Sequence, residues 1–203
     1  SYLPALKQET FTVGTSYRHF QGVHTQTYSV SYSYLNNRSL KYLDNDESIS
    51  GNMILESSGL EGKAQARFEN RSYLGAWTVR EGAEASFRHY DVNAFRRLTD
   101  GRSAEYASAL GFWGWGAYAS ADYKSPSGKV NTSFGLRIDG SSFSSNTAKV
   151  WKQLSPRASV SYMPWESWSF NASAGIYHQL PPVTALAFRD ADGVKVNADL
   201  EYM

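Results

Sequence analysis

The sequence predicts an all-β fold: an antiparallel up-and-down meander of about eight long strands that forms part of a transmembrane β-barrel. Three observations predict it: apolar and polar side chains alternate along many segments, these segments are long, and their connections alternate between short and long. Alternation with a period of two is typical of a strand with one apolar and one polar face. In residues 154–162, for example, one face carries Leu154, Ala158, Val160 and Tyr162, and the other carries Ser155, Arg157, Ser159 and Ser161.

The length of the alternating segments separates a membrane barrel from an ordinary globular sheet. Strands are expected over residues 8–20, 24–36, 60–72, 77–92, 105–123, 128–141, 152–163 and 166–178. Strands of globular proteins average about 5–6 residues, whereas a tilted strand needs about 9–11 residues to cross a membrane. The expected strands therefore favour the membrane-spanning class.

The connections between these strands give the meander a direction. Short turns are expected near residues 21–23, 72–76, 125–128 and 164–166, and long loops near 37–59, 93–104, 142–151 and 179–203. Tight periplasmic turns and longer extracellular loops characterise outer-membrane barrels. A Greek-key β-sandwich has no reason to gather every long loop at one end. We therefore interpret residues 1–203 as a single, partial outer-membrane β-barrel domain.

Composition agrees with this fold and excludes several classes of function. The 20 Lys and Arg residues nearly balance 19 Asp and Glu residues, so charge gives no reason to expect nucleic acid as a partner. Cysteine is absent, which excludes disulfides and thiolate metal sites. Aromatic residues make up 15% of the chain although its mean hydropathy is −0.48, as expected when strands face lipid on one side and a polar lumen on the other.

No motif points to catalysis, a cofactor or a bound metal. The acidic cluster Asp44–Glu47 could hold Ca²⁺, but it lacks the ligand spacing of an EF-hand, so a solvated loop is the simpler interpretation. A Gly-x-Ser-x-Gly elbow, which a hydrolase triad would use, is also missing. The four histidines share no metal-ligand spacing; they are His19, His24, His89 and His178. We expect a protein that is not an enzyme, and we assign no catalytic, cofactor-binding or metal-binding residue.

Charged residues recur on the polar faces of the expected strands. We hypothesise that they form charge ladders between strands on the lumen side. The residues are Arg67, Arg88, Arg137 and Arg157, with Glu69, Glu84, Asp122 and Asp139.

Three stretches resemble the barrel of TonB-dependent outer-membrane receptors, most closely those of the Bacteroides type. They are Phe134-Gly-Leu-Arg-Ile-Asp139, Leu154-Ser-Pro-Arg-Ala-Ser-Val-Ser-Tyr162, and the stretch from Trp168 through Tyr177 to Pro182. In that family such stretches occur in this order, on rising and descending strands.

The resemblance implies a receptor in the bacterial outer membrane that imports a scarce nutrient: a siderophore-iron complex, a cobalamin, a glycan or a peptide. Its expected partners are outer-membrane lipid, a plug domain, the TonB complex and the nutrient. Because ligand contacts in the family lie mainly in the plug and loop tips, the resemblance names no substrate-binding residue here.

The departures from the family pattern are as informative as the matches. Neither a plug domain nor a TonB-contacting box is recognisable, and about eight strands are expected where receptor barrels have about 22. We therefore expect a fragment from the middle of a receptor barrel, whose edge strands would tend to self-associate when isolated. Two alternatives remain open: a small outer-membrane structural barrel or adhesin, and a soluble carbohydrate-binding β-sandwich.

Overall fold

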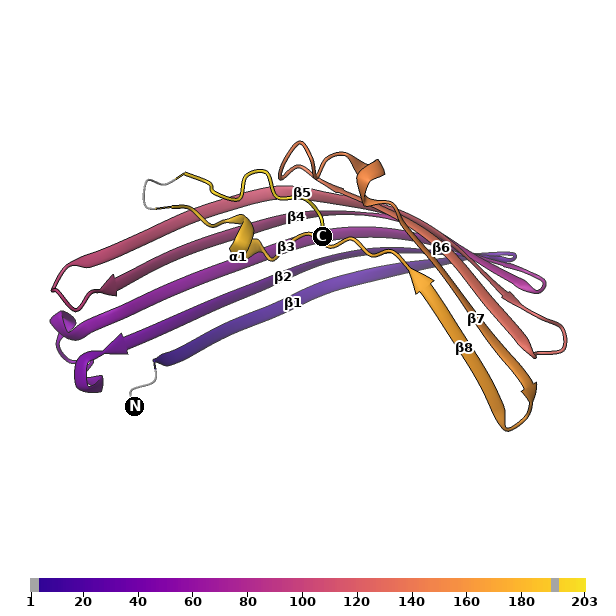
Figure 1. Ribbon diagram of the computed structural model, residues 1–203, viewed down its shortest axis with the longest axis horizontal. Helices are drawn as coiled ribbons and strands as arrows, with labels where there is room; N and C mark the ends of the chain where they lie inside the picture. The colour runs from indigo at the N-terminus through magenta and orange to yellow at the C-terminus, as the bar shows by residue number, and fades with distance from the viewer. Residues whose placement is uncertain (1–3, 191–193) are drawn as a thin grey trace.

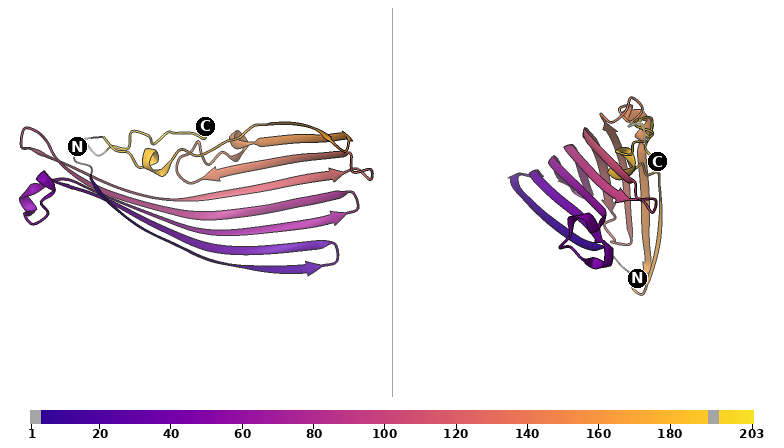
Figure 2. Two further views of the ribbon diagram at one scale, coloured as in Figure 1. Left: turned by 90° about the horizontal axis from the view of Figure 1, so that it is seen from below. Right: turned by 90° about the vertical axis from the view of Figure 1, so that its left-hand side faces the viewer.

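Eight antiparallel strands form one curved sheet in the computed structural model, which describes residues 4–190 and 194–203 (Figure 1). The strands pair in chain order, each with the next, and this confirms the predicted up-and-down meander. They are β1 (Ala5–Gln21), β2 (His24–Tyr42), β3 (Met53–Leu74), β4 (Trp77–Arg97), β5 (Ser103–Lys124), β6 (Val130–Ser141), β7 (Ser155–Trp165) and β8 (Trp168–Gly175). Figure 2 shows the strands fanned into an arc rather than lying in one plane.

The first five strands extend further toward the long loops than the sequence predicted. The expected loop 37–59 shrinks to residues 43–52, which contain the short 3₁₀ helices η1 (Leu43–Asn45) and η2 (Ser50–Asn52). The β2–β3 ladder continues through pairs such as Arg38 with Ser58. Apolar and polar side chains do not alternate regularly there, so backbone pairing persists where the apolar alternation has ended. The prediction of a long loop was therefore wrong in this region.

The short turns gather at the opposite end of the sheet and match their predicted positions. Gly22 and Gly75 adopt φ values of +57° and +63° in the β1–β2 and β3–β4 turns. Tight hairpin turns require this left-handed conformation, which glycine adopts without steric cost. Between β7 and β8 the register shifts between Tyr162 and Trp165, where Pro164 interrupts regular pairing.

One face of the sheet, termed the outer face, exposes an apolar band. On β5 this band consists of alternate residues from Trp113 to Tyr123, with three alanines and Trp115 between them. Trp113 has 56% of its surface exposed, and Phe134 on β6 has 54%. Aromatic rings pair across strands at both limits of the band: Phe87 and Trp113 have centroids 5.2 Å apart, and Trp77 and Tyr123 have centroids 4.9 Å apart.

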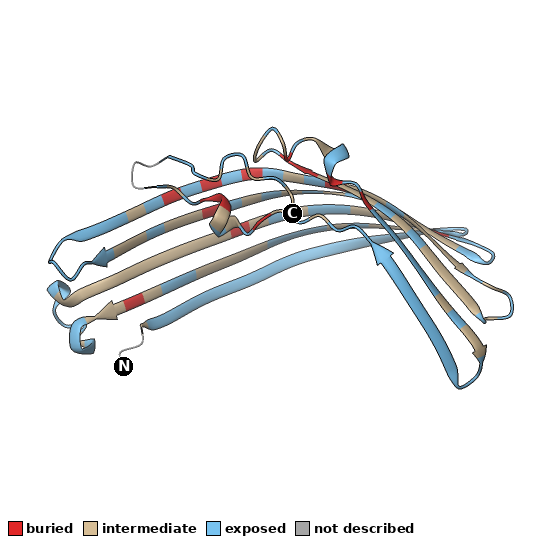
Figure 3. Ribbon diagram, in the orientation of Figure 1, coloured by how far each residue is buried: buried red, intermediate tan, exposed pale blue. Residues whose placement is uncertain are grey.

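The opposite face, termed the inner face, is covered at its long-loop end by residues 176–190 and 194–203, together termed the C-terminal segment. This segment folds back over β4 and β5 and contains the short helix α1 (Val183–Leu186). Leu186 is fully buried against a cluster that includes Tyr90, Leu110 and Phe112. Figure 3 shows buried positions in this segment and on the strands beside it. The hydroxyl groups of Tyr106 and Ser108 donate hydrogen bonds of 3.0 and 2.6 Å to the Ala187 carbonyl. The described residues of the expected loop 179–203 therefore lie on the sheet as a packed cover, held by apolar burial.

The sheet is open among the described residues. β1 and β8 form its two edges, and no pairing joins them. A closed eight-stranded barrel requires that pairing, and a sandwich requires a second sheet. Neither alternative arrangement is therefore observed in this part of the chain. No described helix is long and apolar enough to span a membrane.

Candidate functional site: the charged inner face

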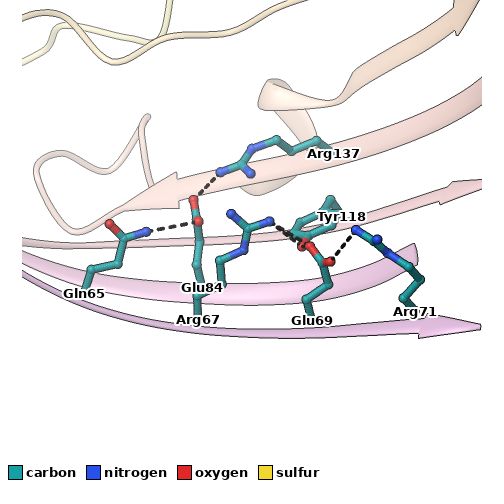
Figure 4. A network of polar contacts seen from close by, with 7 residues as sticks. All are labelled: Gln65, Arg67, Glu69, Arg71, Glu84, Tyr118 and Arg137. Carbon is teal, nitrogen blue, oxygen red and sulfur yellow. Dashed lines mark hydrogen bonds and ion pairs between the residues drawn. The ribbon is translucent and has the colours of Figure 1, made fainter. Parts of the chain in front are cut away.

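The turn-side half of the inner face carries an extended network of ion pairs and hydrogen bonds (Figure 4). Arg137 on β6 is at its centre. Its Nη2 atom lies 2.5 Å from Glu84 Oε1 on β4 and 2.6 Å from Asp139 Oδ1 on its own strand. Gln65 on β3 donates a 3.3 Å hydrogen bond to the other oxygen of Glu84. Side chains of three strands are thereby joined across the sheet.

A second part of the network centres on Glu69 of β3. The Tyr118 hydroxyl donates a 2.7 Å hydrogen bond to Glu69 Oε2 and accepts one of 2.8 Å from Arg67. Arg67 and Arg71 also form ion pairs with Glu69, at 2.9 and 3.3 Å. The same carboxylate is therefore shared by two arginines and one phenol.

Two glycines allow these contacts to pass over an intervening strand. A Cβ atom on Gly116 of β5 would lie 2.7 Å from Asp139 Oδ1 and 3.0 Å from Arg137 Nη2. A Cβ atom on Gly82 would lie 2.7 Å from the ring of Tyr118. All three distances are shorter than normal van der Waals contacts. The missing side chains therefore create the space in which β4 contacts β6 and β3 contacts β5.

The hypothesis of interstrand charge ladders is confirmed for three of its eight residues: Arg137 pairs with Glu84 between β6 and β4, and Asp122 pairs with Arg80 between β5 and β4. Arg67 with Glu69, and Asp139 with Arg137, form ion pairs within a single strand, and Arg67 and Glu69 contact β5 through the Tyr118 hydroxyl. The other two arginines lie over aromatic rings: Arg88 is 6.0 Å from the centroid of Phe112, and Arg157 is 4.4 Å from that of Tyr177.

Four residues that take part in these contacts were not among the eight predicted ladder residues, although the polar face of an expected strand already contained two of them, Gln65 and Tyr118; the other two are Arg71 and Arg80. Each lies an even number of residues from one of the eight predicted residues, and strand side chains separated by two share a face. That parity was a usable signal. The contacts across Gly82 and Gly116 had no sequence signal, because they join side chains that are not on neighbouring strands.

A pocket of about 440 Å³ opens beside the network on the inner face. Residues of six neighbouring strands, β3 to β8, line it, which requires the sheet to curve toward this face. Four of the lining residues are arginines: Arg67, Arg80, Arg137 and Arg157. Serine and tyrosine hydroxyl groups supply most of its other polar atoms.

The histidines and the acidic loop form no comparable site. Across the described ranges 4–190 and 194–203, no group of three or more His, Asp or Glu side chains is arranged to hold a metal ion. His19 and His24 do not pair, since Gln26 and Gln21 are their respective partners across the hairpin. Asp46 accepts hydrogen bonds from the Ser48 hydroxyl and amide groups, at 2.5 and 2.9 Å, and these bonds hold its pKa below the ordinary value for aspartate.

Comparison with known proteins gives a family and a fold. The family model described as "TonB dependent receptor-like, beta-barrel" matches residues 3–201. Among solved structures, one described as "Copper transporter OprC" superimposes with a TM-score of 0.65 at 13% sequence identity. The match covers 89% of this chain and 33% of that one, so the chain spans about a third of the solved structure. No curated protein sequence matches the chain. Because the family model covers nearly all of its length, the chain belongs to the TonB-dependent receptor-like β-barrel family.

Proposed function

We propose that residues 1–203 form part of the wall of a larger outer-membrane barrel, and that the parent protein imports a scarce nutrient with energy supplied through TonB. The observation that carries this proposal is the apolar band of the outer face opposite a charged inner face. Along β5 the band runs from Trp113 to Tyr123. At about 3.3 Å per residue and a tilt of about 40°, its height is about 25 Å, the height of the lipid-facing band in outer-membrane barrels.

The family supports the remaining parts of the proposal. A TonB-dependent receptor of the Bacteroides type would carry a plug domain inside its barrel, and the charged inner face offers a polar wall for it. The nutrient would be a siderophore-iron complex, a cobalamin, a glycan or a peptide. The proposed activity is transport rather than enzymatic catalysis, and the proposed location is the bacterial outer membrane.

The solved structure named as a copper transporter does not make copper the preferred cargo. Its identity to this chain is 13%, which supports a common fold and no common ligand. The described residues contain no group of three or more metal-ligating His, Asp or Glu side chains, and the sequence has no cysteine. A copper site would need soft or imidazole ligands gathered in one place.

Fractionation and growth of the source bacterium test the proposal. The parent protein should sediment with the outer membrane. A strain without the protein should grow poorly under one of four conditions: limiting ferric citrate, limiting cyanocobalamin, a polysaccharide as sole carbon source, or a peptide as sole nitrogen source. Uptake of that nutrient by the wild-type strain should cease when a protonophore collapses the proton gradient. Sedimentation with the inner membrane, together with unchanged growth under all four conditions, would overturn the proposal.

We also infer that the isolated chain self-associates through its edge strands. β1 has 17 residues, and the backbone groups that point away from β2 have no strand partner among the described residues. Unpaired edges of this length promote association. Light scattering of the refolded chain in detergent should show dimers or larger species, and shortening β1 should reduce them. A monodisperse monomer at high protein concentration would contradict this inference.

A further inference from the structure

The inner face carries an excess of positive charge that the whole chain does not have. Between the level of Glu61 and the short turns, the strand registers place nine basic and five acidic side chains on this face. The basic residues are Arg18, Lys63, Arg67, Arg71, Arg80, Arg88, Lys124, Arg137 and Arg157, and the acidic residues are Glu61, Glu69, Glu84, Asp122 and Asp139. The complete sequence, in contrast, has a net charge of only +1. Positive charge is therefore concentrated on the concave side of the sheet.

Two cross-strand pairs on this face join like charges. Arg71 lies directly opposite Arg80, and Lys63 lies directly opposite Arg88. Like charges in directly opposed positions destabilise a sheet. The Nε atoms of Arg71 and Arg80 are also buried and have no hydrogen-bond partner among the described residues. Buried N–H groups of this kind normally have an acceptor. The inner face around Arg71 and Arg80 therefore has too few hydrogen-bond acceptors for its donors.

The 440 Å³ pocket on the inner face also contains more positive than negative side chains. Its lining includes four arginines and no carboxylate, because the acids that pair with three of them, Glu69, Asp122 and Glu84, lie outside it. Arg80 and Arg157 lie on one level of the sheet, separated only by Ser120 and Gly135. A Cβ atom on Gly135 would meet nothing closer than 3.7 Å. The floor between the two arginines is therefore open.

We propose that this pocket binds a ligand that carries clustered carboxylates. The guanidinium group of Arg157 would hold one carboxylate by paired N–H donors, a geometry that suits arginine better than lysine. Arg80, whose Nη2 atom already pairs with Asp122, would bind a second carboxylate through its remaining exposed donors. The Cα positions of these two residues are separated by three strand spacings, or about 14 Å, and both side chains are long enough to reach toward a small polycarboxylate between them. Hydroxyl groups of Ser120, Ser133 and Ser159 line the space between and can donate to the remaining oxygens.

The carboxylates have two sources: a small solute in the lumen, or an acidic segment of a polypeptide. This inference concerns the chemistry of the wall and stands whether or not the parent protein imports a nutrient. The experiment must therefore detect binding directly, with one probe for each source.

Calorimetric titration of the full-length protein in detergent tests the proposal with citrate as the first probe and trimethyl citrate as its uncharged counterpart. Citrate should bind, the triester should not, and added salt should weaken binding because the attraction is between charges. The double substitution R80Q/R157Q should weaken citrate binding at least about tenfold, the loss expected when charge-assisted hydrogen bonds are removed. The matched control R38Q removes an arginine from the outer face and should leave affinity unchanged.

A second variant keeps every arginine, so that a loss of binding can be told apart from misfolding caused by removing arginines. Gly135→Asp introduces a carboxylate into the open floor and should reduce citrate affinity as strongly as the double substitution. A glutamate-rich peptide and its glutamine counterpart then distinguish the two sources. Tighter binding of the acidic peptide than of citrate identifies a polypeptide segment, and the reverse order identifies a small solute. If neither citrate nor the acidic peptide binds at millimolar concentration, or if R38Q weakens binding as much as R80Q/R157Q, the proposal is overturned.

Discussion

At the scale of single residues, the ion pairs of the inner face need glycines, whose missing side chains leave room for the contacts. Gly116 leaves space for the ion pair between Arg137 and Glu84, whose side chains retain only 28% and 23% exposure. Partly buried charges of this kind lose much when one partner is displaced, because the other stays desolvated. The stability of this network therefore depends on the glycines that leave room for it.

Substituting Gly116 with alanine should destabilise the sheet. The new Cβ atom would lie 2.7 Å from Asp139 Oδ1, so the carboxylate and the Arg137 guanidinium must move apart. We expect a loss of about 1–3 kcal/mol, the usual cost of disturbing a charged hydrogen bond. Urea unfolding in detergent, followed by tryptophan fluorescence, measures it. Gly135→Ala is the matched control on the same face and should change the unfolding midpoint little; equal effects would refute the role given to Gly116.

The pKa of Asp46 offers a residue-level test in the β2–β3 loop. Hydrogen bonds from the Ser48 hydroxyl and amide groups lower this pKa, so they stabilise the charged carboxylate. Their contribution is present at neutral pH and is lost as the pH falls through the lowered pKa. In an NMR titration the Asp46 carboxyl should titrate below the value of about 3.9 for an unstructured aspartate, and Ser48→Ala should raise its midpoint. A midpoint at or above the unstructured value would contradict the assigned contacts.

At the scale of elements, the sequence was most informative where one face of a strand is apolar. The segments around β6, β7 and β8 alternate cleanly, and β7 was predicted to within a few residues of its observed bounds, Ser155–Trp165. The extensions of β1 to β5 were missed because side chains such as Asn37, Arg38 and Ser39 give no periodic signal. Backbone hydrogen bonding, which is independent of side-chain polarity, continues the ladder there.

The packing of the C-terminal segment was also outside the reach of sequence patterns. Its contact with β4 and β5 joins residues about 80 positions apart, as shown by the 79-residue separation of Ser108 and Ala187. Pro181 and Pro182 are incompatible with a continuing strand, because neither can donate to a ladder, but β8 already ends at Gly175. They contain no information about which surface the following residues cover.

Leu186→Ala should release this segment from the sheet. Leu186 is fully buried, and truncation of a buried leucine costs about 2–5 kcal/mol. Hydrogen exchange should accelerate at the Leu186 and Ala187 amides, which now donate to the Pro182 and Val183 carbonyls. Leu43→Ala, at a leucine with 54% exposure, is the control and should leave exchange unchanged. Unchanged protection in Leu186→Ala would mean that apolar burial does not hold the segment.

At the scale of the whole molecule, the two faces of the sheet have opposite chemistry over the same stretch of strand. The outer face is apolar from Trp113 to Tyr123 on β5 and becomes more polar beyond Trp113, where Ala107 pairs with Asn93 and Glu105 with Phe95. The inner face is charged behind the apolar band and buried behind the polar extension. This exchange of polar and apolar character between the two faces is expected for a barrel wall that crosses lipid and projects beyond it. The family of the chain agrees with this arrangement.

The most direct test of this account compares two arginine substitutions on the outer face of β5. Ala117 lies within the apolar band, between Ala83 and Ile138 on the neighbouring strands, and Ala107 lies beyond the band. In lipid bilayers Ala117→Arg should destabilise the protein by about 2–4 kcal/mol, whereas Ala107→Arg should cost about 0–1 kcal/mol. Denaturant unfolding of the full-length protein from lipid vesicles gives both values. Equal and small effects would contradict the assignment of the outer face to lipid.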